Sequence, residues 1–119
     1  MFIIVLDTNI ILDSIKFKVD LFTELKRVCN FPYKISVLDK TLQELENKKN
    51  SKLALELIKK KNIQVIKTQE GYVDNILLKL DNNYIIATND KELKNKLKKA
   101  NRKIITLRQK KYLITENVL

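Results

Sequence analysis

Three short runs of consecutive apolar residues restrict the fold of this chain more than any other feature. They are Phe2–Leu6 (FIIVL), Tyr84–Ala87 (YIIA) and Ile104–Leu107 (IITL), and they are rich in β-branched residues. Strands that are apolar on both faces, without a polar residue at every second position, are typical of a parallel sheet covered by helices. The sequence therefore predicts a parallel sheet as the centre of the fold.

Amphipathic segments fill the stretches between these runs. Apolar residues at helical spacing predict helices over 19–29, 38–48, 51–61, 71–80 and 90–100, a short helical turn over 9–14, and further strands over 34–37 and 63–66. Ser51 is the expected N-cap of its helix, Leu53, Leu57 and Ile58 are expected to face inward, and Thr88-Asn89 is expected to cap the helix that follows. This alternation predicts helices on both faces of the sheet and one ligand site at the carboxyl ends of the strands.

Size and charge limit the class of protein. The 119 residues fit a single domain spanning residues 1–119, and the net charge is +10 with a pI near 9.7. A basic domain of this size indicates a polyanionic partner, either nucleic acid or an anionic membrane, whereas a solvated lysine-rich surface is the simpler explanation.

Missing residue types narrow the chemistry. The chain contains no histidine, which excludes histidine-based triads and the usual zinc sites. Cys29 is the only cysteine, and its helical neighbours predict a buried, inert thiol in a reducing cytoplasm. The apolar run at the N-terminus ends at Asp7, which is too short for a membrane span, so no membrane association is expected. Catalysis in this chain would depend on carboxylates together with a hard metal ion.

Four carboxylates stand where the predicted fold could gather them. Asp7 directly follows the first buried strand and Asp90 follows another by three residues, so both belong to the carboxyl edge of the sheet. Glu44 and Asp74 lie on predicted helices. Carboxylates held close together repel one another unless a cation neutralises them, and oxygen ligands suit Mg²⁺ or Mn²⁺. Each acid alone also fits a helix cap, a first-turn acid or a solvated face.

Four further segments form a set of motifs: VLDTN (5–9), VLDKTLQELENK (37–48), YVDNILLKL (72–80) and IIATNDKELKNKL (85–97). Through them the chain resembles the PIN-domain ribonucleases over almost its whole length. The segment TLRQKKYL (106–113) is similar to the archaeal PIN branch that is related to the eukaryotic rRNA-processing endonucleases.

The resemblance implies a three-layer α/β/α sandwich with a central, mainly parallel sheet and a metal-binding acidic pocket. It assigns the catalytic acids to Asp7, Glu44, Asp74 and Asp90, with the metal held by Asp7, Asp74 and Asp90, and it assigns supporting polar roles to Asn9 and Thr88. Close relatives of this branch carry a second acid where this chain has Asn75, which puts a second metal site in doubt.

The activity implied is hydrolysis of RNA with Mg²⁺ or Mn²⁺ as cofactor, leaving a 5′-phosphate and a 3′-hydroxyl. The residues expected to bind RNA are Arg108, Lys110, Lys111 and Lys91, with Lys16, Lys18 and Lys94 as further candidates. Contacts of lysine and arginine with phosphates give affinity without sequence recognition. A solvated surface is the alternative for each of these lysines, and Tyr112 could stack on a base or serve packing.

Three other functions remain open at the sequence level. One is a VapC-type toxin ribonuclease with an antitoxin partner, in place of an RNA-processing enzyme. Another is a PIN fold that binds RNA without cutting it. As for partners, a second copy of the chain in a homodimer and a ribosome-biogenesis protein both remain open. A phosphoacceptor receiver domain is the third, but the strand over 63–66 is not followed by the aspartate that it needs.

Overall fold

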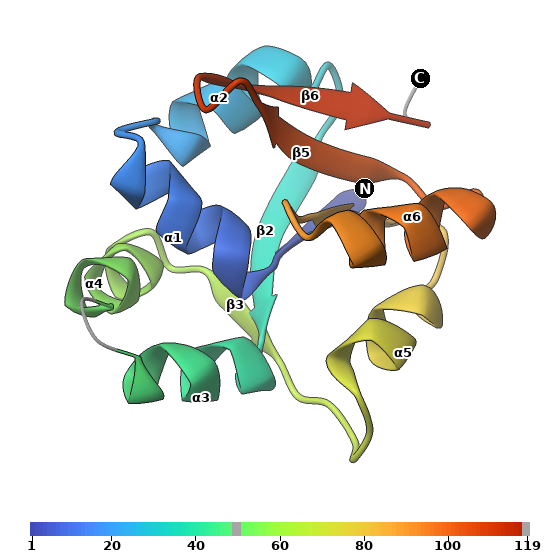
Figure 1. Ribbon diagram of the computed structural model, residues 1–119, viewed down its shortest axis with the longest axis horizontal. Helices are drawn as coiled ribbons and strands as arrows, with labels where there is room; N and C mark the ends of the chain where they lie inside the picture. The colour runs from blue at the N-terminus through green and yellow to red at the C-terminus, as the bar shows by residue number, and fades with distance from the viewer. Residues whose placement is uncertain (49–50, 118–119) are drawn as a thin grey trace.

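A six-stranded sheet runs through the middle of the protein in the strand order β3-β2-β1-β4-β5-β6 (Figure 1). The computed structural model describes residues 1–48 and 51–117. The strands are β1 (Phe2–Leu6), β2 (Tyr33–Leu38), β3 (Gln64–Ile66), β4 (Tyr84–Ala87), β5 (Ile104–Arg108) and β6 (Tyr112–Glu116). Neighbouring strands from β3 to β5 pair in parallel, and β6 pairs with β5 in the antiparallel sense. The three continuous apolar runs form β1, β4 and β5, as their composition predicts.

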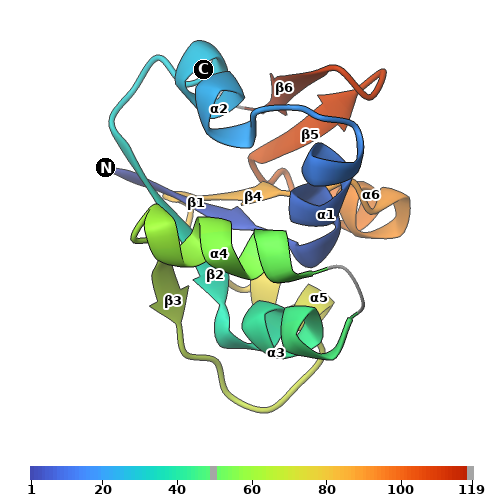
Figure 2. The same ribbon diagram turned by 90° about the vertical axis from the view of Figure 1, so that its left-hand side faces the viewer.

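Helices cover both faces of the sheet. They are α1 (Thr8–Lys16), α2 (Leu21–Val28), α3 (Asp39–Asn47), α4 (Lys52–Lys60), α5 (Val73–Leu78) and α6 (Lys91–Lys99). In Figure 1, α1 and α4 lie to the left of the central strands, and α5 and α6 lie to the right; Figure 2 views the molecule from the side of α1 and α4. Among these described helices, none has the length and apolar character needed to cross a membrane.

Two apolar clusters join the three layers. One contains Ile10 of α1, Leu25 of α2 and Ile58 of α4, packed against the sheet. The other contains Leu77 of α5 and Leu97 of α6 on the opposite face. Burial of aliphatic side chains from both faces of the strands is the main stabilising contribution to such a fold. The three-layer α/β/α sandwich with a mainly parallel sheet is therefore confirmed.

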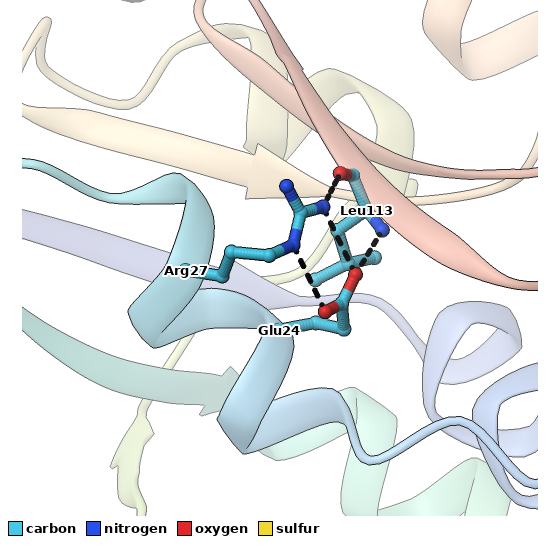
Figure 3. Close-up of polar contacts among 3 residues, drawn as sticks. All are labelled: Glu24, Arg27 and Leu113. Carbon is cyan, nitrogen blue, oxygen red and sulfur yellow. Dashed lines mark hydrogen bonds and ion pairs between the residues drawn. The ribbon is translucent and has the colours of Figure 1, made fainter.

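The C-terminal hairpin was not foreseen from the sequence. The segment after Leu107 reads as a basic tail, yet Arg108 ends β5 and Tyr112 begins β6, with a tight turn between them. Figure 3 shows how α2 holds the outer edge of β6. Glu24 accepts a hydrogen bond from the N–H of Leu113 at 2.9 Å, and Arg27 donates one to its carbonyl at 2.7 Å. Both backbone groups of Leu113 that β5 leaves free are thereby satisfied, which protects an edge strand.

The expectations about α4 were right only in part. Ser51 occupies the N-cap position but its side chain makes no capping bond to α4; its hydroxyl instead donates to the carbonyls of Leu45 and Lys48 at the end of α3. Leu53 is 50% exposed, and Ala54 takes the inward position next to Ile58, while Leu57 is half-buried. The inward stripe of α4 is thus rotated relative to the one expected.

Several helices end without glycine. Lys18 after α1, Asn62 after α4 and Asn101 after α6 have left-handed backbone angles, with φ of 57°, 51° and 55°. In each case a backbone N–H bonds back into the last turn, as in helix-ending motifs that usually contain glycine. Asparagine tolerates this conformation comparatively well, whereas lysine does so less readily.

Candidate active site

Asp7 stands where β1 ends and α1 begins. It is the N-cap residue of α1, and its Oδ1 accepts a hydrogen bond from the N–H of Thr8 at 2.9 Å. Its Oδ2 accepts a second one from the hydroxyl of Thr88 at 2.8 Å. Its position at the carboxyl edge of the sheet, next to the end of β4, is the one that the sequence predicts.

Burial raises the pKa of the Asp7 carboxyl above its ordinary value, because a charged group loses solvation there. The hydrogen bonds from Thr88 and Thr8 lower the pKa, and the negative charges of Glu44 and Asp90 raise it further. Glu44 and Asp90 are therefore near enough to act on Asp7, although they come from α3 and from the start of α6.

Thr88 and Asn9 lie beside Asp7, as expected for supporting polar residues. The hydroxyl of Thr88 donates to Asp7 and accepts a hydrogen bond from the backbone N–H of Asp90 at 3.1 Å. Asn9 Oδ1 lies 3.3 Å from this hydroxyl and accepts from the N–H of Asn89 at 3.1 Å. The end of β4 is thereby fixed against the start of α1.

Asp90 combines two functions in its position. It is the N-cap of α6, and its Oδ1 accepts from the N–H of Leu93 at 2.9 Å, so the cap is Asp90 and not the Thr88-Asn89 pair expected from the sequence. Only one carboxylate oxygen is needed for this cap. Capping and participation in the acidic centre are therefore compatible.

Glu44 and Asp74 are placed differently from Asp7. Glu44 is exposed on α3, and Asp74 on α5 forms an ion pair with Lys96 at 3.4 Å. Within residues 1–48 and 51–117, no three acidic or sulfur-bearing side chains lie close enough together to hold a metal ion. The roles of these acids as ligands remain predictions.

The donors present suit a cation that needs few protein ligands. Asp7 offers a desolvated carboxylate with Glu44 and Asp90 within electrostatic range. Mg²⁺ usually keeps several water molecules and is held by one or two carboxylates together with substrate phosphates. Mn²⁺ accepts the same oxygen ligands. The chemistry of this donor set therefore fits Mg²⁺ or Mn²⁺ bound at Asp7.

Asn89 lies at the centre of the site, whereas the sequence predicted only that it caps the helix that follows. Its Nδ2 donates to Asp13 Oδ2 at 3.0 Å, and its Oδ1 accepts from the N–H of Leu107 at 2.9 Å. Thr106 Oγ1 lies 3.3 Å from the same oxygen. Asn89 therefore ties α1 and β5 to the segment that carries Thr88 and Asp90. The position of Asn89 in the chain, between Thr88 and Asp90, was the feature of the sequence that could have indicated this role.

A second pair of contacts orders the loop before α5. Asp39 accepts hydrogen bonds from the hydroxyl of Thr68 at 2.7 Å and from its N–H at 3.2 Å, and Lys40 donates to the carbonyl of Gly71 at 2.5 Å. The hydroxyl of Thr68 is the main cause of the lowered pKa of Asp39. These bonds fix the approach to Asp74 and to the exposed Asn75.

The basic residues expected to bind RNA lie in two places. Lys91 is exposed in the first turn of α6, while Arg108, Lys110 and Lys111 are exposed around the turn between β5 and β6. Lys94 is engaged with the hydroxyl of Thr106 at 3.2 Å. Positive charge thus lies close in the chain to Asp90 and at the end of β5.

Cys29 takes no part in this centre. It is buried with 7% exposure, and burial raises its pKa to about 11, so the thiolate is scarcely populated near neutral pH. An inert thiol is what its helical neighbours predict.

Comparison with known proteins decides the family. A family model described as a PIN like domain matches residues 4–110. The chain belongs to the PIN-like family. The matched range includes the end of β1 with Asp7, β4 with Thr88, and α6 with its cap Asp90. The family resemblance inferred from the sequence motifs is therefore confirmed.

Two relatives place this PIN-like protein more closely. Ribonuclease VapC4 of Methanocaldococcus jannaschii (strain ATCC 43067 / DSM 2661 / JAL-1 / JCM 10045 / NBRC 100440) is 38% identical over 124 residues, covering 94% of this chain and 95% of the relative. The structure of the PIN domain endonuclease Utp24 superposes with a TM-score of 0.84 at 23% identity, covering 98% of this chain and 92% of the other. The first supports homology to a ribonuclease, and the second shows the shared fold.

Proposed function

We propose that this PIN-like protein is a metal-dependent endoribonuclease that hydrolyses RNA phosphodiester bonds at the acidic centre around Asp7. The observation that carries the proposal is the desolvated carboxylate of Asp7, held by Thr88 and influenced by Glu44 and Asp90. Negative charges held close together at the edge of a sheet lower the stability of the fold. Such unfavourable arrangements of charge are found mainly at functional sites. Full-length similarity to a ribonuclease supports the same activity.

Each residue has a distinct task in this proposal. Asp7, Asp74 and Asp90 would hold the cation, and Glu44 would complete the acidic centre. Thr88 and Asn9 orient Asp7 through the bonds described above. Mg²⁺ or Mn²⁺, when bound, neutralises these carboxylates and the scissile phosphate and supports activation of water near neutral pH. Asp74 must leave or share its ion pair with Lys96 to take part.

The RNA is held by basic side chains. Arg108, Lys110, Lys111 and Lys91 are exposed, which leaves them available to phosphates. Such contacts give affinity that falls as salt rises and carry no sequence information. We place this activity in the cytoplasm, in the processing of rRNA or another RNA. The processing role rests on the resemblance of residues 106–113 to the archaeal processing branch.

A toxin of the VapC type is the second candidate. The 38% identity to Ribonuclease VapC4 over nearly the whole chain favours it. In that case a small antitoxin binds the protein and suppresses cleavage. Expression of the protein alone arrests growth if it is a toxin, and co-expression with the product of a neighbouring small gene restores growth. An RNA-processing enzyme produces no such antitoxin-dependent arrest.

Cleavage of labelled single-stranded and structured RNA tests the enzymatic proposal. The wild type is assayed with Mn²⁺, with Mg²⁺ and with EDTA, beside Asp7→Asn and the control Asp20→Asn. Asp20 is an exposed N-cap of α2, so the control removes the same charge from a comparable position. We expect metal-dependent cleavage by the wild type and the control, and a loss of at least about 100-fold in Asp7→Asn. A wild type that binds RNA but never cuts it supports an RNA-binding scaffold instead.

A further inference from the structure

Two basic segments that are distant in the sequence meet around one aromatic ring. Phe17 is the C-cap residue of α1, and its ring is half-buried. The ammonium group of Lys16 lies 5.4 Å from the ring centroid, and that of Lys110, from the β5–β6 turn, lies 5.0 Å from it. A cation over an aromatic face is attracted by the ring quadrupole. Phe17 therefore holds positive charges from both segments in one place.

The backbone around this ring is unusual. Apart from asparagines and Gly71, the described residues with positive φ are Lys18 (57°), Gln109 (54°) and Lys110 (57°). All three adjoin the ring in the chain or lie in the turn that contacts it. Glycine or asparagine adopts this conformation at lower cost, and a two-residue hairpin turn favours Asn-Gly. The chain thus carries lysines where the backbone favours other residues, which indicates that their charge is used.

The basic side chains at this ring and beside it in the chain form no ion pairs within the described residues. Lys16 and Lys110 lie over the ring, and the cations next to them in the chain are Lys18, Arg108 and Lys111; all five are exposed. In the parts of the chain that the structure describes, the ion pairs involve Arg27, Lys96 and Lys98 and none of these five. We call this set, together with Phe17, the Phe17 surface.

The Phe17 surface is connected to the acidic centre by two elements. Helix α1 begins after Asp7 and ends nine residues later at Lys16, a length of about 14 Å. On the other side, the N–H of Leu107 donates to Asn89, which stands between Thr88 and Asp90. Arg108 directly follows Leu107. An RNA strand lying on this surface is therefore within a short reach of Asp7.

We propose that the Phe17 surface is a preformed binding site for the phosphate backbone of single-stranded RNA, and that it guides the strand to the acidic centre. This inference rests on the proposed function, because it takes RNA as the substrate. Phe17 is a positioning residue in it, since the ring orients lysines and need not touch RNA. Lys18 and Lys110 contribute positive charge, but their left-handed backbone angles lower the stability of the fold.

The test replaces those two lysines by residues that their backbone favours. Binding of a fluorescent single-stranded RNA is measured in EDTA over a range of salt for the wild type and the double variant Lys18→Asn/Lys110→Gly. We expect the dissociation constant to rise about tenfold and the slope of its logarithm against log salt to fall by about 1.4, because two phosphate contacts are lost. We also expect the melting temperature to rise by about 2–4 °C.

Two further variants separate charge from position. Lys59→Gln/Lys99→Gln removes two exposed lysines from the ends of α4 and α6, and we expect little change in RNA binding. Phe17→Leu keeps every charge and an apolar side chain, and we expect about a three-fold rise in the dissociation constant. Equal losses in the two lysine pairs, or unchanged binding by Lys18→Asn/Lys110→Gly, overturn the proposal.

The outcomes also distinguish this proposal from the enzymatic one. If the wild type cleaves RNA and the double variant binds RNA as tightly as the wild type, only the proposal for the Phe17 surface is refuted. If the wild type never cleaves but the double variant loses salt-sensitive binding, the surface stands and the enzymatic proposal fails. Binding of a polyglutamate peptide serves as a third assay. Loss of peptide binding with RNA binding unchanged assigns the surface to an acidic protein and overturns the proposal.

Discussion

Single side chains at the ends of β1 and β4 form the centre of the proposed active site. Asp7 is both the N-cap of α1 and a partly desolvated carboxylate near Glu44 and Asp90. The sequence could predict Asp7 and Asp90 because each follows a buried parallel strand, where ligand sites form. It could not predict the bonds of Asn89, whose partners Asp13 and Leu107 are 76 and 18 residues away.

Substitution of Asp7 by asparagine is expected to stabilise the metal-free protein. The pKa of Asp7 is raised in the folded chain, so stability is lost as the pH rises through that pKa and the group ionises. Asp7→Asn removes this loss, and its single amide oxygen keeps one of the two hydrogen bonds, from Thr88 or from the N–H of Thr8. Thermal unfolding at pH 7 in EDTA measures the difference.

Added metal is expected to stabilise the wild type much more than Asp7→Asn. At a Mn²⁺ concentration of 100 times its dissociation constant, the wild type gains about 2.7 kcal/mol. Asp7→Asn gains much less, whereas the control Asp20→Asn gains as much as the wild type. A wild type whose melting temperature ignores Mn²⁺ contradicts the assignment of the metal to Asp7.

Removal of the Asn89 side chain tests its positioning role. Asn89→Ala loses the bonds to Asp13 and to the N–H of Leu107, and we expect a loss of about 1–3 kcal/mol in the free energy of unfolding. We also expect kcat to fall about tenfold or more with KM less affected, because the alignment of Thr88 and Asp90 is lost. Urea unfolding and cleavage kinetics measure both effects. Asn95→Ala, at an exposed position of α6, is the matched control and should change neither.

At the scale of elements, regular helices and strands were predictable and their ends were not. The apolar runs of β1, β4 and β5 specify buried strands by composition alone. The strand β6 was not predicted, because its sequence YLITE contains charged and polar residues. The turn before it, Gln109-Lys110, also lacks the usual Asn-Gly signal of a hairpin. The long-range bonds of α2 to Leu113 hold the outer side of this edge strand (Figure 3).

The contact between α2 and β6 predicts a pH-dependent stability. Glu24 has a lowered pKa, chiefly because Arg27 donates hydrogen bonds to it, with a further contribution from the N–H of Leu113. A lowered pKa adds stability above the unfolded-state pKa, and this is lost as the pH falls through the folded-state value. Glu24→Ala should therefore cost about 1 kcal/mol at pH 7 and less in acid.

Urea unfolding at pH 7 and near pH 3 measures this change. Glu56→Ala, at an exposed position of α4, makes the same substitution in a helix without a bond to β6 and serves as the control. Equal losses for both variants, or a loss in Glu24→Ala that does not depend on pH, would show that Glu24 does not hold β6.

At the scale of the whole molecule, the fold places opposite charges at the two ends of α1. Its N-terminus carries the acidic centre, and its C-terminus carries the Phe17 surface. In the proposed function, the positive charge attracts RNA and the acids would bind the cation needed to cut it. Composition indicated the polyanionic partner, but the meeting of residues 16–18 with residues 108–111 depends on the unforeseen hairpin. The fold and family were therefore predictable, and the arrangement of the basic surface was not.

The chemistry of the RNA ends tests the central claim most directly. RNA cut by the wild type with Mn²⁺ is analysed by mass spectrometry, beside RNA treated with Asp7→Asn and Asp20→Asn. Hydrolysis by an activated water predicts 5′-phosphate and 3′-hydroxyl ends, formed by the wild type and Asp20→Asn and absent from Asp7→Asn. Fragments ending in 2′,3′-cyclic phosphate, or the same products from Asp7→Asn, would contradict a metal-dependent acidic centre at Asp7.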